Sequence, residues 1–437
     1  MNRKIFRLAI SVVVVLFAVV FFIYPAVTLC VVVFDSHLKT TGESLLVPNW
    51  FDSASQRYLS WANEFTSTNY AQSLDQHDVA GTEWPMFGSV FFLLTAEEMQ
   101  KHGFKFRESA IEAVEKAAQV VASPVTATWV KTKWGEHYLD KENVFYRMLL
   151  ILGLSSYEKI TGSRQYHSLM AGQRDGLAGE LAAAKYHLLD DYPGECYPND
   201  VLWAVAAIQR AAGAEGIAHG ELARKVLNVL DGPVKTAEGL PAFQVEAESA
   251  RILQGARGCG SSGILIFAAE LDRAVAGRWY NAYEASFWKD SEWIAGFREL
   301  PQGESKAFMD IDSGPVLFGF GSVASVFGVG AAKTNGRFDH AVPMTMEVVA
   351  FSWPTPFGLL VPGAMGLLAV KSWSLGEVAI LFSMTRPANA EKTVPFTGHT
   401  PIIVWVLLVF YAGTGLLLIG REIMRIKRIS RSIGEQK

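Results

Sequence analysis

Two long apolar runs without a charged side chain stand near the two ends of the chain. The first covers residues 8–34 and is dominated by Val, Leu, Phe and Ile, and the second covers residues 401–420. A membrane-spanning helix needs about 20 consecutive apolar residues, so each run predicts one span. No small-residue cleavage site follows the first run, which favours a retained anchor over a cleaved signal peptide.

Basic residues flank both runs on the sides that face the chain ends. Arg3, Lys4 and Arg7 precede the first run, and Arg421, Arg425, Lys427, Arg428 and Arg431 follow the second. Because Lys and Arg near a span favour the cytoplasmic side, both ends are predicted to be cytoplasmic. The predicted order is a cytoplasmic N-terminus (1–7), a span (8–34), an extracytoplasmic domain (35–398), a second span (399–420) and a basic cytoplasmic tail (421–437). In a Gram-negative cell the domain would lie in the periplasm, held by the inner membrane.

Five apolar runs of helical length recur through the predicted domain. They begin after Glu83, Asn143, Asp200, Gly263 and Pro315, at intervals of 60, 57, 63 and 52 residues. A sixth candidate begins at Pro362, 47 residues further on. Recurrence at a fixed interval is the signature of a repeated structural unit.

Amphipathic segments alternate with these apolar runs, at residues 105–123, 163–185, 220–230 and 278–294. Helices that are apolar all round are buried, whereas helices with one apolar face lie at the surface. An inner ring of helices wrapped by an outer ring satisfies both requirements. The sequence therefore predicts an all-α domain, an (α/α)6 toroid of about six helical hairpins, flanked by an N-terminal and a C-terminal transmembrane helix.

Two further uncharged runs, at residues 313–332 and 348–370, are long enough to be extra spans. The first contains five glycines, and the second contains Pro354, Pro356 and Pro362. Both runs also fit the repeat interval, which favours inner helices of the toroid. Two extra spans remain the alternative, and they would leave the C-terminus cytoplasmic.

Composition and motifs exclude several classes of function. The net charge of −4 gives no reason to expect a nucleic-acid partner. No P-loop, dinucleotide fingerprint, nucleophile elbow or zinc motif is present, so we predict no metal and no cofactor. Cys30 lies inside the first span, which leaves Cys196 and Cys259 in the domain. These two cysteines either form a disulfide in an oxidising compartment or are two buried thiols.

Candidate chemistry lies where the apolar runs begin. Helix N-termini carry unpaired N–H groups and suit anionic groups. Glu83, Asp200 and Asp312 stand at three such positions, and Glu83 lies among apolar and aromatic neighbours that would raise its pKa. We predict Glu83 as a general acid, with Asp200 or Asp312 as the base or as a stabiliser of a cationic transition state. The alternative is that each residue only caps its helix.

Further polar and aromatic side chains surround the same helix starts and are predicted to bind substrate. They are Trp84, His137, Asn143, Tyr146, Tyr197, Asn199 and Asp310. Aromatic rings suit the C–H face of a sugar, although they also pack helices together. His137 is the one histidine that we would test as a proton carrier.

Two segments carry a resemblance to a known family. KENVFYRMLLILGLSSYEKITGSRQYHSLM and the following GECYPNDVLWAVAAIQRA resemble the core of the linalool dehydratase/isomerase-like domain. That resemblance implies a toroidal fold and assigns Cys196 a part in lyase or isomerase chemistry. Val205 and Leu149 stand where that family's second cysteine and its histidine are expected, so the resemblance implies the fold more specifically than the reaction.

Three functions are consistent with these features. The first is a membrane-anchored enzyme that uses acid/base chemistry on an envelope glycan or a lipid-linked sugar. The second is a lyase or isomerase centred on Cys196. The third is a non-catalytic, glycan-binding or scaffolding subunit of a polysaccharide synthesis or export assembly. The expected partners are the lipid bilayer, a glycan or lipid-linked substrate, and other membrane proteins of envelope biogenesis.

Overall fold

The computed structural model describes residues 2–67, 83–213, 216, 220–304, 309–362 and 375–434, and this part of the chain is mostly helical. The five apolar runs are confirmed as helices. They are α6 (Trp84–Lys101), α9 (Val144–Thr161), α11 (Pro198–Gly213), α13 (Gly258–Leu271) and α15 (Ser322–Thr334). The run proposed to begin at Pro362 lies almost wholly outside the described residues, and the next described helix is α18 (Leu375–Thr385).

The fifth helix begins later than the sequence predicts. Residues 309–321 form a three-stranded sheet instead, made of β5 (Met309–Asp310), β6 (Gly314–Leu317) and β7 (Phe320–Gly321). Gly314, Phe318 and Gly319 all have positive φ angles, of 60°, 55° and 87°. This left-handed conformation is incompatible with a continuing right-handed helix, so α15 begins only at Ser322.

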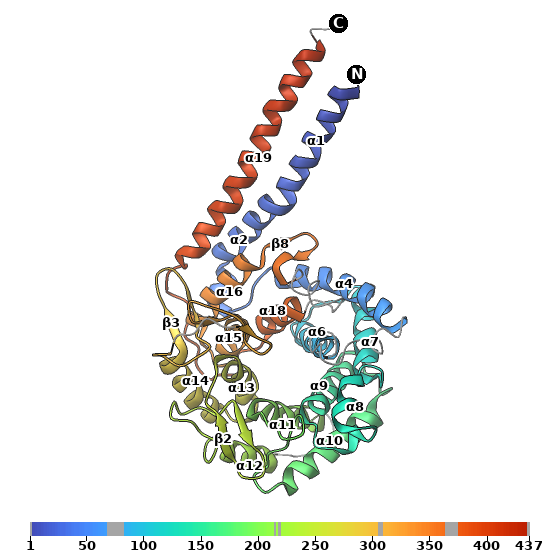
Figure 1. Cartoon of the computed structure of the whole chain (residues 1–437), viewed down its shortest axis with the longest axis vertical. Helices are drawn as coiled ribbons and strands as arrows, with labels where there is room; N and C mark the ends of the chain where they lie inside the picture. The colour runs from blue at the N-terminus through green and yellow to red at the C-terminus, as the bar shows by residue number, and fades with distance from the viewer. Residues whose placement is uncertain are drawn as a thin grey trace.

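Six helices form a closed cycle of contacts, and we call them the inner helices. In order they are α6, α9, α11, α13, α15 and α18; each contacts the next, and α18 contacts α6. Figure 1 shows them nearly end-on around a common centre, with the amphipathic helices outside. The outer helices are α4 (Val47–Ser67), α7 (Glu108–Ala122), α10 (His167–Ala183), α12 (Gly220–Leu230), α14 (Arg273–Phe287) and α16 (Phe338–Ser352).

Short elements connect these helices. They are α3 (Ser36–Thr41), α8 (Thr128–Trp134), η3 (Tyr138–Asp140), β1 (Gln244–Glu246), β2 (Arg251–Gln254), β3 (Trp288–Asp290), β4 (Ala295–Phe297), β8 (Pro354–Thr355) and β9 (Gly358–Leu359). The strands pair only locally, as antiparallel hairpins and the small sheet before α15.

Aromatic side chains fill the centre of the inner helices. Phe91 of α6 stacks on Phe382 of α18 with ring centroids 4.5 Å apart, and Trp203 of α11 packs on Phe267 of α13 at 4.7 Å. All four side chains are buried. Burial of one large aromatic side chain removes about 150–250 Å² from water and contributes several kcal/mol at about 25 cal/mol per Å². Trp203 also packs on Phe382 of α18 across the cycle at 6.3 Å, so these aromatic contacts join both neighbouring and opposite helices.

Ion pairs connect the C-terminal ends of the inner helices. Arg210 of α11 contacts Glu97 of α6 at 2.6 Å and Glu270 of α13 at 3.1 Å. Ser156 of α9 also donates a 2.7 Å hydrogen bond to Glu97. Glu97 is almost fully buried, and Arg210, Lys101 at 2.9 Å and Lys159 at 3.5 Å together compensate its charge. The ends of α6, α9, α11 and α13 are thus fixed by one polar network.

Two helical segments are long and apolar enough to cross a membrane. The first is Ile5–Phe34, which covers most of α1 (Asn2–Ala18) and all of η1 (Val19–Ile23) and α2 (Tyr24–Phe34). The second is Ile402–Arg431 within α19 (Ile402–Gly434). The segments run side by side away from the domain (Figure 1). The Ser11 hydroxyl donates a 2.6 Å hydrogen bond to Glu422, which fixes their register.

The described residues give no further helix that meets the criteria for a span. Residues 313–332 form β6, β7 and most of α15, and α15 lies among the inner helices. The described part of the run 348–370 comprises the end of α16 and the β8–β9 hairpin. Neither run forms the continuous helix that a span requires.

Candidate functional site

The beginnings of the inner helices bring together the three carboxylates that the sequence singles out. Glu83 immediately precedes α6, Asp200 lies in the first turn of α11, and Asp312 lies in the small sheet before α15. The negative charge of Asp312 raises the pKa of both Glu83 and Asp200, and Glu83 also raises the pKa of Asp200. Residues more than 100 positions apart in the sequence therefore share one electrostatic environment.

Glu83 binds its proton more tightly than an ordinary carboxyl does. Burial is the main cause that raises its pKa to about 7, and Asp312 raises the pKa further, whereas a hydrogen bond from Tyr192 and the charge of Lys133 lower it. The Tyr192 hydroxyl donates directly to Glu83 Oε1. The Glu83 side chain makes no capping hydrogen bond to α6, so the capping interpretation is wrong for this residue. A carboxyl with a pKa near 7 retains its proton in a large share of molecules at neutral pH.

Burial and a hydrogen bond from Asn199 act on the pKa of Asp200 in opposite directions. Burial raises its pKa, and a 2.9 Å hydrogen bond from Asn199 Nδ2 to Asp200 Oδ1 opposes that rise. Asp191 is a further carboxylate at this end of the inner helices, and it is fully buried. Burial, followed by the charge of Asp200, raises the pKa of Asp191. Closely spaced carboxyls in a desolvated site favour shared protons over full ionisation.

Asp312 is the most accessible of the three carboxylates. Its side chain is exposed, yet desolvation is the main cause of its raised pKa, followed by the charge of Asp310, whereas Arg257 opposes the rise. Asp310 has a structural role, because its Oδ1 accepts hydrogen bonds from the backbone N–H groups of Asp312 and Ser313 at 3.2 and 2.7 Å.

An ion-pair network stabilises the small sheet that carries Asp312, and no pattern in the sequence predicts this network. Arg257 contacts Glu299 and Asp310, both at 2.8 Å. Glu299 is fully buried and accepts hydrogen bonds from the backbone N–H and the thiol of Cys259, both at 3.1 Å. The network thus ties the start of α13 to the sheet that carries Asp312. Glu299 and Tyr192 lie outside the recurring helix starts, and no spacing pattern distinguishes them.

Two of the predicted aromatic residues remain partly accessible near the carboxylates. Trp84 is the first residue of α6, and Tyr197 immediately precedes α11. Tyr197 packs edge-on against Phe243 at 5.5 Å and donates a 2.9 Å hydrogen bond to Glu195. Burial and then Glu195 raise the pKa of Tyr197, and the charges of Asp312 and Asp191 add to the rise.

Other predicted binding residues serve packing or lie at the surface. Tyr146 is buried and packs against Trp129 at 5.9 Å. Asn143 is also buried, has a left-handed backbone with φ 39°, and donates a 3.2 Å hydrogen bond to the carbonyl of Tyr138. His137 is 86% exposed and lies 4.0 Å from Asp140, so its contacts give it no link to the carboxylates.

The three cysteines are all free thiols, so the structure contains no Cys196–Cys259 disulfide. Cys196 is fully buried, and its backbone carbonyl accepts a 3.0 Å hydrogen bond from Val245 of β1. Burial, followed by the charge of Asp191, raises the pKa of the Cys196 thiol well above its usual range. Such a thiol stays protonated at neutral pH and is not an activated nucleophile.

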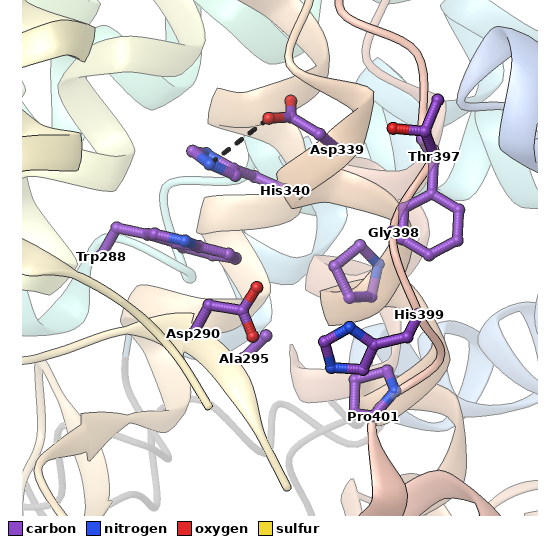
Figure 2. Close-up of a pocket in the computed structure, with 11 residues that line it drawn as sticks. Trp288, Asp290, Ala295, Asp339, His340, Thr397, Gly398, His399 and Pro401 are labelled. Atoms are coloured by element: carbon purple, nitrogen blue, oxygen red, sulfur yellow. Dashed lines mark ion pairs between the residues drawn. The ribbon is translucent and has the colours of Figure 1, made fainter. Parts of the chain in front are cut away.

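A separate pocket lies where β3, the start of α16 and the segment before α19 meet, as Figure 2 shows. Its wall includes Trp288 and His340, whose rings stack at 4.0 Å. His340 also hydrogen-bonds to Tyr280 and Arg337, both at 2.9 Å. Burial is the main cause that lowers its pKa to about 4. His340 is therefore a neutral, fully partnered side chain, and the predicted site residues do not line this pocket.

The described residues contain no group of three or more His, Cys, Asp or Glu side chains arranged to hold a metal ion. No protein-family model matches the chain, and no curated protein matches its sequence.

Proposed function

We propose that this protein is a membrane-anchored enzyme whose domain lies outside the cytoplasm and uses acid/base chemistry on an envelope glycan or a lipid-linked sugar. The observation that carries the proposal is the electrostatic coupling of Glu83, Asp200 and Asp312 at the beginnings of three inner helices. Capping alone does not require helices from distant repeats to place their acidic residues within reach of one another.

The proposed scaffold is an (α/α)6 toroid. The closed cycle of contacts from α6 through α18 supports it, as does the outer layer of amphipathic helices. In such a scaffold the carboxylates lie at one end of the inner helices, and the Glu97–Arg210 network lies at the other. The aromatic side chains between them close the centre, so substrate would enter and leave from the carboxylate end.

The proposed roles follow from accessibility and proton affinity. Glu83, with its raised pKa and its hydrogen bond from Tyr192, protonates the leaving oxygen of a glycosidic bond. Asp312, the most exposed carboxylate, activates a water molecule or stabilises the cationic sugar ring. Asp200, whose pKa is raised to about 7 by burial and then by the charges of Asp312 and Glu83, is a second proton-binding carboxyl that accepts or returns a proton during the reaction. Trp84 and Tyr197 offer ring faces to the sugar.

The test uses the Glu83→Gln variant of the full chain to capture substrate without turnover. The purified variant is applied to an array of bacterial envelope oligosaccharides, and each captured glycan is then given to the wild-type protein. We expect wild-type protein to release new reducing ends from a captured glycan and Glu83→Gln to release none. Glu115→Gln, an exposed carboxyl on α7, is the matched control and retains activity.

Two results would contradict the proposal. Turnover by Glu83→Gln at the wild-type rate would remove Glu83 from the chemistry. Capture of glycans that wild-type protein leaves intact would favour a binding subunit over an enzyme.

A further inference from the structure

A group of exposed apolar side chains lies where the domain meets the two candidate spans. We define the apolar edge as Phe351, Phe357, Leu360 and Val361, at the end of α16 and on the β8–β9 hairpin and its flank. Their exposed fractions range from 41% for Leu360 to 70% for Phe357. No charged residue occurs between Glu347 and Lys371. Contiguous exposed apolar surface of this kind usually marks an interaction site.

Trp353 fixes the apolar edge against the middle of both spans. Its indole N–H donates a 2.7 Å hydrogen bond to the carbonyl of Phe21, and its ring packs on Phe22 at 5.7 Å. The same ring packs on Tyr411 of α19 at 5.2 Å. In return, the Tyr411 hydroxyl donates a 2.9 Å hydrogen bond to the carbonyl of Ala350. The end of α16 is therefore attached to both helices at one level.

The depth of the Trp353–Tyr411 contact in the membrane follows from the position of Tyr411 in the second span. Arg421 is the first basic residue after the second apolar run, and Tyr411 lies ten residues before it. At 1.5 Å per residue, Tyr411 is about 15 Å from Arg421, which is about half of a 30 Å hydrocarbon layer. An apolar span that ends at Arg421 must extend back to about Pro401 to cross that layer. Trp353 therefore lies at the depth of the bilayer interior.

The halves of both spans that are nearer the domain also expose apolar side chains. Val27 and Phe34 of α2 are 56% and 68% exposed, and Val409 of α19 is 69% exposed. Both helices contact α16, whose end carries Phe351 of the apolar edge. The apolar edge is thus attached to helices that also expose apolar side chains.

The backbone of the hairpin meets the requirement that a bilayer imposes on non-helical segments. Inside hydrocarbon, peptide groups must find partners within the protein. Leu360 N–H donates to the Trp353 carbonyl at 3.0 Å, Phe357 N–H donates to the Thr355 hydroxyl at 3.2 Å, and that hydroxyl donates to the Gly358 carbonyl at 2.8 Å. The Leu359 N–H donates a 3.4 Å hydrogen bond to Glu377 Oε1, and Glu377 forms a 2.6 Å ion pair with Arg57.

We infer that the apolar edge is inserted into the lipid bilayer and that the domain is immersed along this edge. Figure 1 shows the inner helices nearly end-on while α1 and α19 lie in the plane of the view. The axis of the inner helices is therefore roughly parallel to the membrane surface, and their carboxylate end opens sideways along it. An edge bound in this way brings the site within reach of a substrate that stays in the membrane.

Site-directed fluorescence quenching tests the inference with the full chain. In a Cys30→Ser background, Phe357→Cys and Leu360→Cys are labelled with an environment-sensitive fluorophore, since Cys196 and Cys259 are buried. The labelled protein is placed in nanodiscs of phosphatidylethanolamine and phosphatidylglycerol. Val409→Cys on α19 is the lipid-exposed control, and Ile252→Cys on β2, far from the spans, is the aqueous control.

We expect doxyl-labelled lipid to quench positions 357 and 360 as strongly as position 409, and aqueous iodide to quench only position 252. Quenching of both hairpin labels by iodide but not by lipid would overturn the inference. Protection from both quenchers would overturn it as well, because another protein chain would then cover the edge. The readout needs no reaction, so it is independent of the proposed catalysis.

Discussion

Replacement of Glu83 by Gln should change how the stability of the protein depends on pH. In the folded chain the pKa of Glu83 rises from 4.5 to about 7, chiefly because the carboxyl is buried. The folded state then binds this proton more tightly than the unfolded state does. The contribution of Glu83 to stability is therefore fully present below pH 4.5 and is lost as the pH rises to about 7.

The size of the effect follows from the shift. A pKa rise from 4.5 to about 7 corresponds to about 3 kcal/mol, and solvent screening at this partly exposed side chain reduces it to roughly 2 kcal/mol. Gln keeps the shape and can accept the Tyr192 hydrogen bond, but it never acquires the buried charge. For a domain of this size, roughly 2 kcal/mol corresponds to about 3 °C in Tm.

The assay is thermal denaturation of the full chain in detergent at pH 4.5 and at pH 8. We expect the Tm of Glu83→Gln, relative to wild type, to be about 3 °C higher at pH 8 than at pH 4.5. The exposed control Glu115→Gln should give the same Tm difference at both pH values. A Glu83→Gln difference that is independent of pH would refute the reasoning, since Glu83 would then titrate as an ordinary surface carboxyl.

Three further predictions concern the site and its support. Tyr192→Phe removes a hydrogen bond that lowers the pKa of Glu83, so the alkaline limb of the activity–pH profile should move to higher pH. An alkaline limb that does not move would contradict the role of Glu83 as the general acid. Arg210→Met should destabilise the fold by about 1–3 kcal/mol in thermal denaturation, because it leaves the buried Glu97 with only Lys101 and Lys159. The partly exposed Lys225→Met should have little effect. The two cysteines of the domain are free and buried, so a reducing agent should leave Tm unchanged and thiol reagents should modify them only after unfolding.

The sequence predicts the helices well because their signals are local. A helix that is apolar all round is recognisable from its own residues, and α6, α9, α11, α13 and α15 all coincide with predicted runs. The sixth inner helix, α18, has only 11 residues and was not predicted, whereas the run predicted to begin at Pro362 lies almost wholly outside the described residues. The late start of α15 depends on left-handed residues at Phe318 and Gly319, which a hydropathy pattern does not reveal.

Only the site residues that lie at the beginnings of the recurring apolar helices could be predicted from the sequence. Glu83, Asp200 and Asp312 were found in this way, and their mutual influence depends on contacts between distant repeats. Tyr192 and Glu299 act through such contacts alone, so no local pattern marks them. The distinction between Asp310, which orders a turn, and Asp312, which is exposed, also required the geometry of the small sheet.

The most direct test of the account is a titration of the Glu83 carboxyl itself. The full chain is labelled with ¹³C at glutamate side-chain carboxyls, and the Glu83 resonance is assigned by its absence from the Glu83→Gln spectrum. We predict a titration midpoint near pH 7 that falls in Asp312→Asn, because the Asp312 charge raises the Glu83 pKa. A midpoint near 4.5 that Asp312→Asn leaves unchanged would contradict the claim that these carboxylates act as one acid/base site.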